Sequence, residues 1–83
     1  MNHQELARRG FPNIPEDLKL VVRHTRNDDG SGATQAVFSR DGQTPLAVGL
    51  AYCHPKDQFV RHVGWMKAVG RAYGELKRQG FVP

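Results

Sequence analysis

The chain has 83 residues, of which 24% are charged, with a net charge of +4 and a single cysteine. This size fits one domain, residues 1–83, that is able to fold without disulfide or metal staples. No apolar run approaches the ~20 residues that a membrane span requires, and a lone cysteine excludes an intrachain disulfide. We therefore expect a single soluble domain of the reducing cytoplasm, with no membrane contact.

The first half of the chain predicts a short helix followed by two strands. Residues 2–9 suit a helix with Asn2 as its N-cap and Gly10 as its end. Residues 17–26, DLKLVVRHTR, alternate between two faces, as a half-buried strand does. The loop-like NDDGSG then leads into ATQAVFSR, residues 33–40, which predicts the second strand.

A hairpin and a third strand follow. Asp-Gly in RDGQ stands between two strand-like runs, which is the strongest short signal for a hairpin. TPLAVGLAYC, residues 44–53, predicts the third strand. Its large and its small side chains fall on opposite faces: Leu46, Val48, Leu50 and Tyr52 against Ala47, Gly49, Ala51 and Cys53. We expect the large face to form the core, because a two-layer domain has to bury these aliphatic side chains somewhere.

Residues 54–80 predict one long amphipathic helix, with Pro55 at its first position and Gly80 at its end. At about 100° per residue, the apolar side chains share about half of its circumference. They are Phe59, Val63, Trp65, Met66, Val69, Tyr73 and Leu76. In the same arc we expect Gly70 to pack closely against a strand and His62 to be a hydrogen-bonded core residue. The predicted fold is α+β: a short N-terminal helix, a three-stranded antiparallel meander and a long C-terminal helix packed on the sheet.

The surplus positive charge lies on this long helix. Residues 56–79 hold six basic and two acidic side chains, whereas the rest of the chain is balanced. The outer side of the helix is therefore either a solvated surface or a contact for phosphates or an acidic protein surface. Gly64 and Gly74 on this side each cost about 1 kcal/mol relative to alanine, which favours a partner that approaches the backbone. The candidate partner-binding residues are Lys56, Arg61, Trp65, Lys67, Arg71, Lys77 and Arg78.

Arg61 and Trp65 stand one turn apart at the border of the apolar arc. Because Trp and Arg are enriched at binding hot spots, the pair is the candidate anchor for a protein partner. The alternative is that Trp65 belongs to the core and Arg61 stacks on its rim. No metal, phosphate-loop or nucleophile motif is present, and Cys53 and His54 on an extended strand point to opposite faces, which prevents a catalytic dyad. We expect a non-enzymatic protein with no cofactor and no metal.

The order helix, three strands, helix resembles the double-stranded-RNA-binding domain, whose second helix presents lysines to phosphates at its N-terminus. In this chain that helix begins HPKDQF, with Lys56 followed by an acid, so the lysine cluster of that family is absent. Three strands followed by a helix also resemble small DNA-binding domains whose sheet enters the major groove. That resemblance implies an exposed sheet face bearing Lys19, Arg23, Arg26, Gln35 and Arg40.

The segment CHPKDQFVRHVGWMKAVGRA is similar to a C-x-P-x-D-x-F-x-R-x-x-G segment of small proteins from phages and mobile elements. The resemblance implies such an origin, and small phage proteins often bind and block host machinery such as CRISPR effectors, restriction systems or RNA polymerase. We therefore expect an anti-CRISPR-like inhibitor or modulator that binds an acidic surface of a host protein or nucleoprotein complex through the basic helix face. The alternative is a direct DNA- or RNA-binding protein. A third option is a homodimer through the small face of the third strand.

Overall fold

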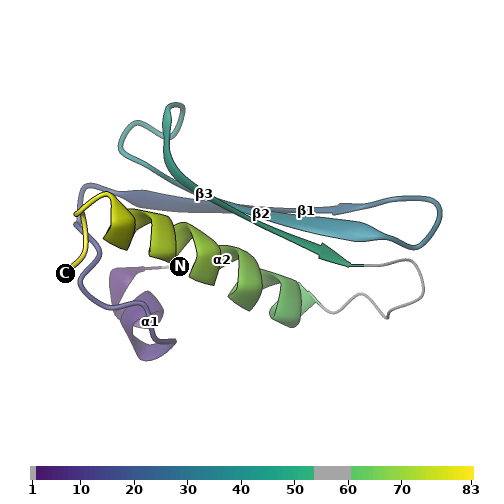
Figure 1. Ribbon diagram of the computed structural model, residues 1–83, viewed down its shortest axis with the longest axis horizontal. Coiled ribbons are helices and arrows are strands. Elements are labelled where there is room, and N and C mark those ends of the chain that lie inside the picture. The colour runs from purple at the N-terminus through teal and green to yellow at the C-terminus, as the bar shows by residue number, and fades with distance from the viewer. Residues whose placement is uncertain (1, 54–60) are drawn as a thin grey trace.

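The computed structural model describes residues 2–53 and 61–83, which form two helices and one sheet. The elements are, in order, α1 (His3–Arg8), β1 (Lys19–Arg26), β2 (Gly32–Ser39), β3 (Pro45–Cys53) and α2 (Arg61–Arg78). The strands pair antiparallel in the order β1-β2-β3. Both helices lie on one side of the sheet, and the connection between β2 and β3 rises on the other (Figure 1). The predicted α+β fold is confirmed.

α1 begins and ends at the residues that its sequence predicts. The side chain of Asn2 accepts a hydrogen bond from the Glu5 N–H at 2.9 Å, which caps the first turn. At the other end Gly10 has a φ of +100°, and the Phe11 N–H bonds to the Leu6 carbonyl at 2.9 Å. This glycine-based ending turns the chain so that Phe11 enters the core.

α2 ends in the same way. Gly80 has a φ of +87°, and the Phe81 N–H bonds to the Leu76 carbonyl at 2.9 Å. The predicted stop at Gly80 is therefore confirmed. The predicted first turns of this helix, with Pro55 and Lys56, lie outside the described residues.

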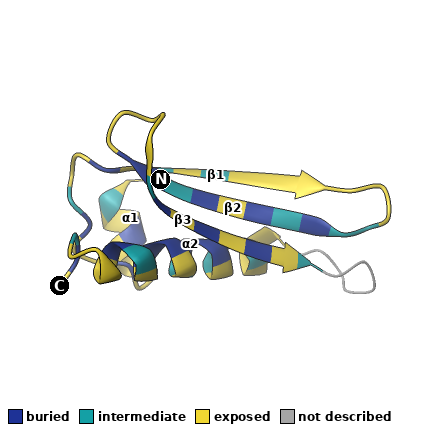
Figure 2. Cartoon of the chain, turned by 45° about the horizontal axis from the view of Figure 1, so that its top comes forward, coloured by how far each residue is buried: buried dark blue, intermediate teal, exposed yellow. Residues whose placement is uncertain are grey.

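α2 packs on the small face of β3 and not on the large one. Ala47 and Ala51 are 3% and 5% exposed, whereas Val48 and Leu50 are each 38% and Tyr52 is 76% exposed. Figure 2 shows this alternation along β3 as dark blue and yellow bands. The prediction that the large face forms the core was wrong. α2 covers this small face, so the face is not open to a second copy of the chain.

Gly49 gives the physical reason for this choice of face. A Cβ atom at Gly49 would lie 1.9 Å from the Ala68 carbonyl oxygen and 2.5 Å from the Ala72 nitrogen. The backbone of α2 therefore rests directly on β3, which requires small residues on both elements. Large side chains from other positions fill the core, among them Leu6, Leu18, Phe38, Val69 and Leu76.

The buried side of α2 is rotated relative to the predicted apolar arc. Val63 is 46% exposed and His62 is exposed, so the expected core position of His62 was wrong. The centre of the buried side holds Ala68 and Ala72, which are fully buried. The predicted arc was based on the positions of large apolar side chains. Close packing of α2 on a strand requires small side chains instead, and these define the buried side.

The glycines of α2 follow this rotation. A Cβ at Gly70 would meet Phe11 at 3.9 Å, an ordinary contact, so the expected close packing of Gly70 on a strand was wrong. Gly64 does not lie on the outer side, because its Cβ would lie 2.6 Å from the Thr34 hydroxyl of the sheet. Gly74 does lie on the outer side, and a Cβ there would have no neighbour within 4 Å.

Candidate functional site

The start of α2 and the first elements of the chain form a hollow around one indole ring. This hollow, of about 260 Å³, is lined by Arg9, His24, Arg61, His62 and Trp65, and we name it the Trp65 hollow. Its residues come from the end of α1, from β1 and from the first turns of α2. Cations and imidazoles surround an aromatic ring here, and Trp and Arg are the residues most enriched at binding hot spots.

Trp65 is held in place by two contacts from the end of α1. The Phe11 ring lies with its centroid 6.2 Å from that of Trp65, and the guanidinium carbon of Arg9 lies 5.1 Å from the Trp65 centroid. The predicted pair of Arg61 and Trp65 does meet in this hollow, but the cation stacked on the indole is Arg9. Sequence patterns could not identify Arg9, because only tertiary packing brings α1 beside α2.

His24 is oriented by a hydrogen bond from β2. Its Nδ1 lies 2.9 Å from the Thr34 hydroxyl, and Thr34 is fully buried. Gly64 of α2 lies directly over this pair, where a side chain would collide with the Thr34 hydroxyl. The glycine therefore leaves room for the hydrogen bond that fixes the imidazole at the wall of the Trp65 hollow.

The middle and end of α2 place polar side chains along the outer edge of β3. The Arg71 guanidinium donates to the Leu50 carbonyl oxygen. The Gln79 amide donates to the Leu46 carbonyl oxygen at 2.7 Å. These two bonds satisfy edge carbonyls that have no neighbouring strand in the described part of the chain. Lys67, one turn before Arg71, is exposed to solvent.

The last turn of α2 carries two further predicted cations that contact neighbours on the helix itself. Arg78 forms a bidentate pair with Glu75, with distances of 3.1 and 2.6 Å, and these hydrogen bonds hold the pKa of Glu75 below its usual value. The Lys77 ammonium lies 5.4 Å from the centroid of the Tyr73 ring. The outer side of α2 thus holds Lys67, Arg71, Lys77 and Arg78, separate from the Trp65 hollow.

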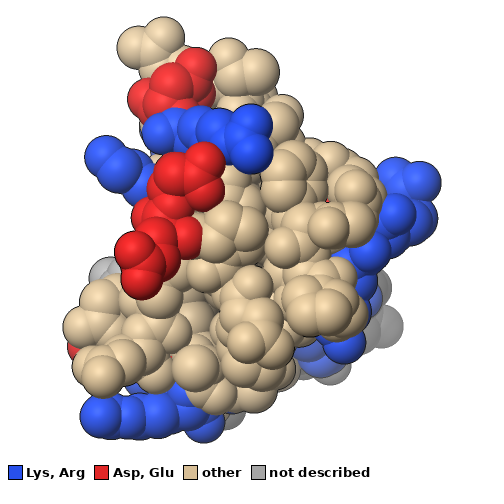
Figure 3. All heavy atoms as spheres, turned by 90° about the vertical axis from the view of Figure 1, so that its left-hand side faces the viewer, with Lys and Arg blue, Asp and Glu red and all other residues tan. Residues whose placement is uncertain are grey.

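Charged side chains of both signs lie at the end of the molecule where the C-terminus lies. Figure 3 shows acidic side chains gathered on one flank of this end with Lys and Arg side chains among them, and further Lys and Arg side chains on the opposite flank and at the base. One ion pair links two of the charged residues: Arg40 Nε lies 2.7 Å from Asp17 Oδ2. Arg40, which the major-groove resemblance placed among exposed sheet cations, therefore already has an acidic partner.

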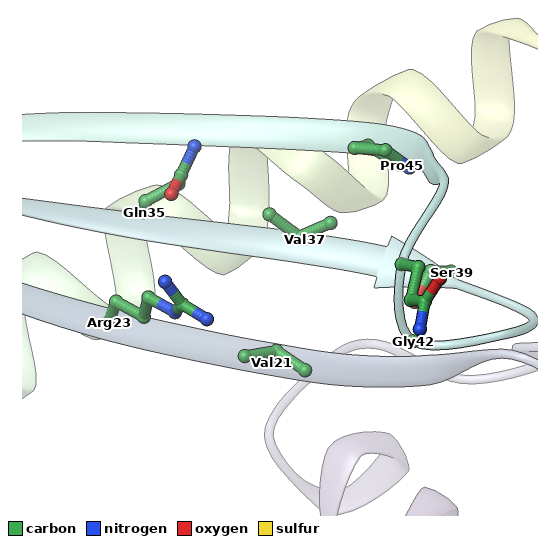
Figure 4. A pocket seen from close by; sticks show the side chains of 8 residues that line it. Val21, Arg23, Gln35, Val37, Ser39, Gly42 and Pro45 are labelled. Carbon is green, nitrogen blue, oxygen red and sulfur yellow. The ribbon is translucent and has the colours of Figure 1, made fainter.

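A second hollow, of about 280 Å³, lies on the face of the sheet that the helices leave uncovered. Arg23 and Gln35 line it on neighbouring strands, beside Val21 and Val37 (Figure 4). The connection between β2 and β3 forms its far wall, and the Asp41 carboxylate holds that connection by accepting two backbone N–H groups. Because two backbone hydrogen bonds favour the carboxylate, the pKa of Asp41 is lowered.

Ser39 lies in the wall of this second hollow and is 1% exposed. Among the residues that the structure describes, its Oγ is buried without a hydrogen-bond partner. A buried hydroxyl that lacks a partner costs about 1–3 kcal/mol. We therefore expect removal of the Ser39 hydroxyl to stabilise the domain.

Comparison with protein-family models, with curated proteins and with solved structures finds no significant match. Within residues 2–53 and 61–83, no three His, Cys, Asp or Glu side chains gather as a metal site would require. The helices in these ranges also lack the length and hydropathy needed to cross a bilayer.

Proposed function

We propose that this chain is a non-enzymatic binding protein of phage or mobile-element origin. In this proposal it acts in the host cytoplasm, where it docks on an acidic surface of a host nucleoprotein machine, such as a CRISPR effector, and inhibits or modulates it. The Trp65 hollow is the observation that carries the proposal. Among the residues that the structure describes, two guanidinium groups and two imidazoles line it beside an indole, without a carboxylate.

The hollow suits a carboxylate-bearing protein surface for two physical reasons. Guanidinium groups bind carboxylates through paired hydrogen bonds, so Arg9 and Arg61 supply matched donors. The indole of Trp65 is partly buried against the core and fixed by Phe11, so a partner would meet a rigid aromatic surface. A rigid aromatic anchor loses little conformational entropy on binding, as the central residues of interfaces require.

The outer side of α2 fits this role less well than the hollow. Arg71 bonds to the edge of β3, and Arg78 is paired with Glu75. A partner that used these cations would have to replace contacts that already exist. Exposed ion pairs are weak, with a median stabilisation of about 0–1 kcal/mol, so a partner could displace them at little cost. The cations on the outer side of α2 also add long-range attraction to an acidic partner.

Charge reversal tests the docking proposal. We expect R9E/R61E to abolish formation of a one-to-one complex with the host machine and to relieve inhibition of its activity. The matched control K67E/K77E changes the charge equally on the outer side of α2 and should retain binding. Purified CRISPR effectors and host RNA polymerase, assayed for DNA cleavage or transcription and for complex size, provide the readout. Equal loss in both variants would contradict an anchor at the hollow.

The second candidate function is direct binding of DNA or RNA. Arg9 stacked over Trp65 favours it, because single-stranded nucleic acids are bound by aromatic rings together with basic side chains. Fluorescence anisotropy with generic single strands and duplexes at about 50 and 200 mM salt separates the two functions. A protein with 6–10 phosphate contacts loses about 10³–10⁵ in affinity over that range. Micromolar or tighter binding with such a slope would favour the nucleic-acid function, and absence of binding at low salt would exclude it.

A further inference from the structure

Within the described residues, the two edge strands of the sheet, β1 and β3, differ in whether side chains bond to their outer backbone groups. β3 has its edge carbonyls of Leu46 and Leu50 bonded to Gln79 and Arg71 of α2. In the part of the chain that the structure describes, β1 pairs with β2 on one side and with no strand on the other. α2 packs mainly on β3 and β2, and Figure 2 shows β1 exposed along the outer border of the sheet. Side chains of α2 therefore protect one edge, while no strand of the described chain pairs with the other.

An accessible edge strand is a template for pairing with another extended chain, and proteins usually block such edges. Here the accessible strand is also basic. β1 carries Lys19, Arg23 and Arg26, all of them exposed, and it carries no acidic residue. Its His24 lines the Trp65 hollow together with Arg61. His24 thus brings the Trp65 hollow to the helix side of β1, while Arg23 points to the opposite, uncovered face.

We propose that β1 accepts an extended acidic segment of the partner as a fourth strand of the sheet. This inference rests on the proposed docking function and names the conformation in which the partner binds. Main-chain hydrogen bonds along β1 would supply affinity, as in other cases of strand addition, and alternate side chains would supply specificity.

The two faces of β1 specify the sequence pattern of this segment. On the uncovered face Lys19 and Arg23 are exposed, and they would lie beside every second side chain of the added strand. On the helix side Leu20 and Val22 are half-buried against the core and would extend it under the new strand. The fitting segment alternates acidic and apolar residues, with its acids on the uncovered face.

A second copy of this chain is a poor occupant of the same edge. Self-pairing of two β1 strands would place the cations of one copy beside those of the other, because the strand holds three cations and no acid. Like charges across a strand pair are destabilising. Opposite charge in the added strand removes that cost, which favours an acidic partner.

The test uses a fluorescent peptide of alternating Glu and Val, about as long as the 8-residue β1. We compare it with analogues methylated on the glutamate nitrogens, on the valine nitrogens and on both. In a strand, alternate residues direct their N–H groups to opposite edges, so methylation of one set leaves one edge able to pair. At least one of the two peptides methylated on a single set should bind with the affinity of the parent peptide. The peptide methylated on both sets should bind about tenfold more weakly or worse.

Amide hydrogen exchange of the protein gives the second readout. Bound parent peptide should slow exchange at alternate amides of Lys19–Arg26 and leave those of β3 unchanged. R23E should weaken binding by about tenfold, while the control K67E should leave it unchanged within about twofold. Equal binding of parent and doubly methylated peptide would overturn strand addition, because attraction would then come from charge alone. Protection at β3 in place of β1 would overturn the choice of edge.

Failure of this inference is separable from failure of the proposed function. If R9E/R61E abolishes docking on the host machine but the peptide adds no strand, only the added strand is refuted. If the peptide adds to β1 but R9E/R61E docks normally, the anchor at the Trp65 hollow is refuted and the strand site stands.

Discussion

Replacement of Gly49 by alanine is the most informative test of how α2 is seated on the sheet. The added Cβ would stand 1.9 Å from the Ala68 carbonyl oxygen, against about 3.4 Å for an ordinary contact. The helix would have to rise by about 1.5 Å, the difference between these two distances. Both close atoms belong to the backbone of α2, so a change of side-chain rotamer cannot relieve the clash.

The expected cost of this substitution follows from the packing around α2. Overpacking a well-packed core costs about 1–3 kcal/mol, and a backbone clash of this depth belongs at the upper end of the range. In a domain of this size each 1 kcal/mol shifts the melting temperature by about 4–8 °C. We therefore expect G49A to lower the melting temperature by about 12–24 °C, as measured by circular dichroism, with a matching shift in the urea midpoint.

Gly74 supplies the matched control, because the same substitution there should act in the opposite direction. It lies in the interior of α2 with no neighbour within 4 Å of its Cβ position. Alanine exceeds glycine in helix propensity by about 1 kcal/mol, so G74A should raise the melting temperature by about 4–8 °C. A melting temperature of G49A within 2 °C of the wild type by the same assay would correspond to a destabilisation of about 0.5 kcal/mol at most. That result would refute direct packing of the α2 backbone on β3.

Three further predictions concern single groups. S39A should stabilise the domain by about 1–3 kcal/mol in urea titrations, because it removes a buried hydroxyl that has no partner among the described residues; an unchanged urea midpoint would contradict this expectation. Y73F should cost about 1 kcal/mol, since the phenol donates to the Pro12 carbonyl oxygen, and a neutral result would show that this bond does not form. The Asp41 carboxyl should titrate below its usual pKa of 3.8, so the stability it contributes is fully present above that pH and is lost as pH falls through the lower folded-state pKa. Carbon-detected NMR titration measures this value, and an unshifted midpoint would contradict the loop hydrogen bonds.

Local signals in the sequence were sufficient for the order and type of the elements. Asn2 and Gly10 bound α1, and Gly80 ends α2, because caps act through hydrogen bonds to their immediate neighbours. Asp41 and Gly42 do occupy the connection between β2 and β3, as the Asp-Gly signal predicted. Such features depend on a few adjacent residues, so a single sequence contains what is needed to predict them.

The choice of core face could not be predicted in the same way, because it depends on two elements at once. Large side chains at Val48 and Leu50 favour burial when β3 is considered alone. The structure instead pairs the small face of β3 with Ala68 and Ala72 of α2, which lets two backbones meet at Gly49. The energetic advantage lies in the fit between the elements, and neither periodicity nor composition reports it.

The candidate site shows the same division between local and tertiary information. The pattern of α2 correctly brought Arg61 and Trp65 together, since they are one turn apart on a single helix. It could not supply Arg9 or His24, which reach the hollow only through the packing of α1 and β1. It also treated Arg71 as a free surface cation, although its guanidinium bonds to the edge of β3.

The close packing of α2 on β3 affects both proposed binding surfaces, the Trp65 hollow and the edge of β1. Because Gly49 lets the helix lie directly on β3, Arg71 is close enough to cap the Leu50 carbonyl at that edge. The same seating draws the middle of α2 toward β3 and leaves β1 at the uncovered border of the sheet. At the start of the helix Gly64 admits the Thr34 hydroxyl that orients the imidazole in the Trp65 hollow. Gly49 and Gly64 both lower the intrinsic propensity of their secondary-structure elements. In return, Gly49 brings α2 close enough to cap the edge of β3, and Gly64 leaves room for the hydrogen bond that orients His24 in the Trp65 hollow.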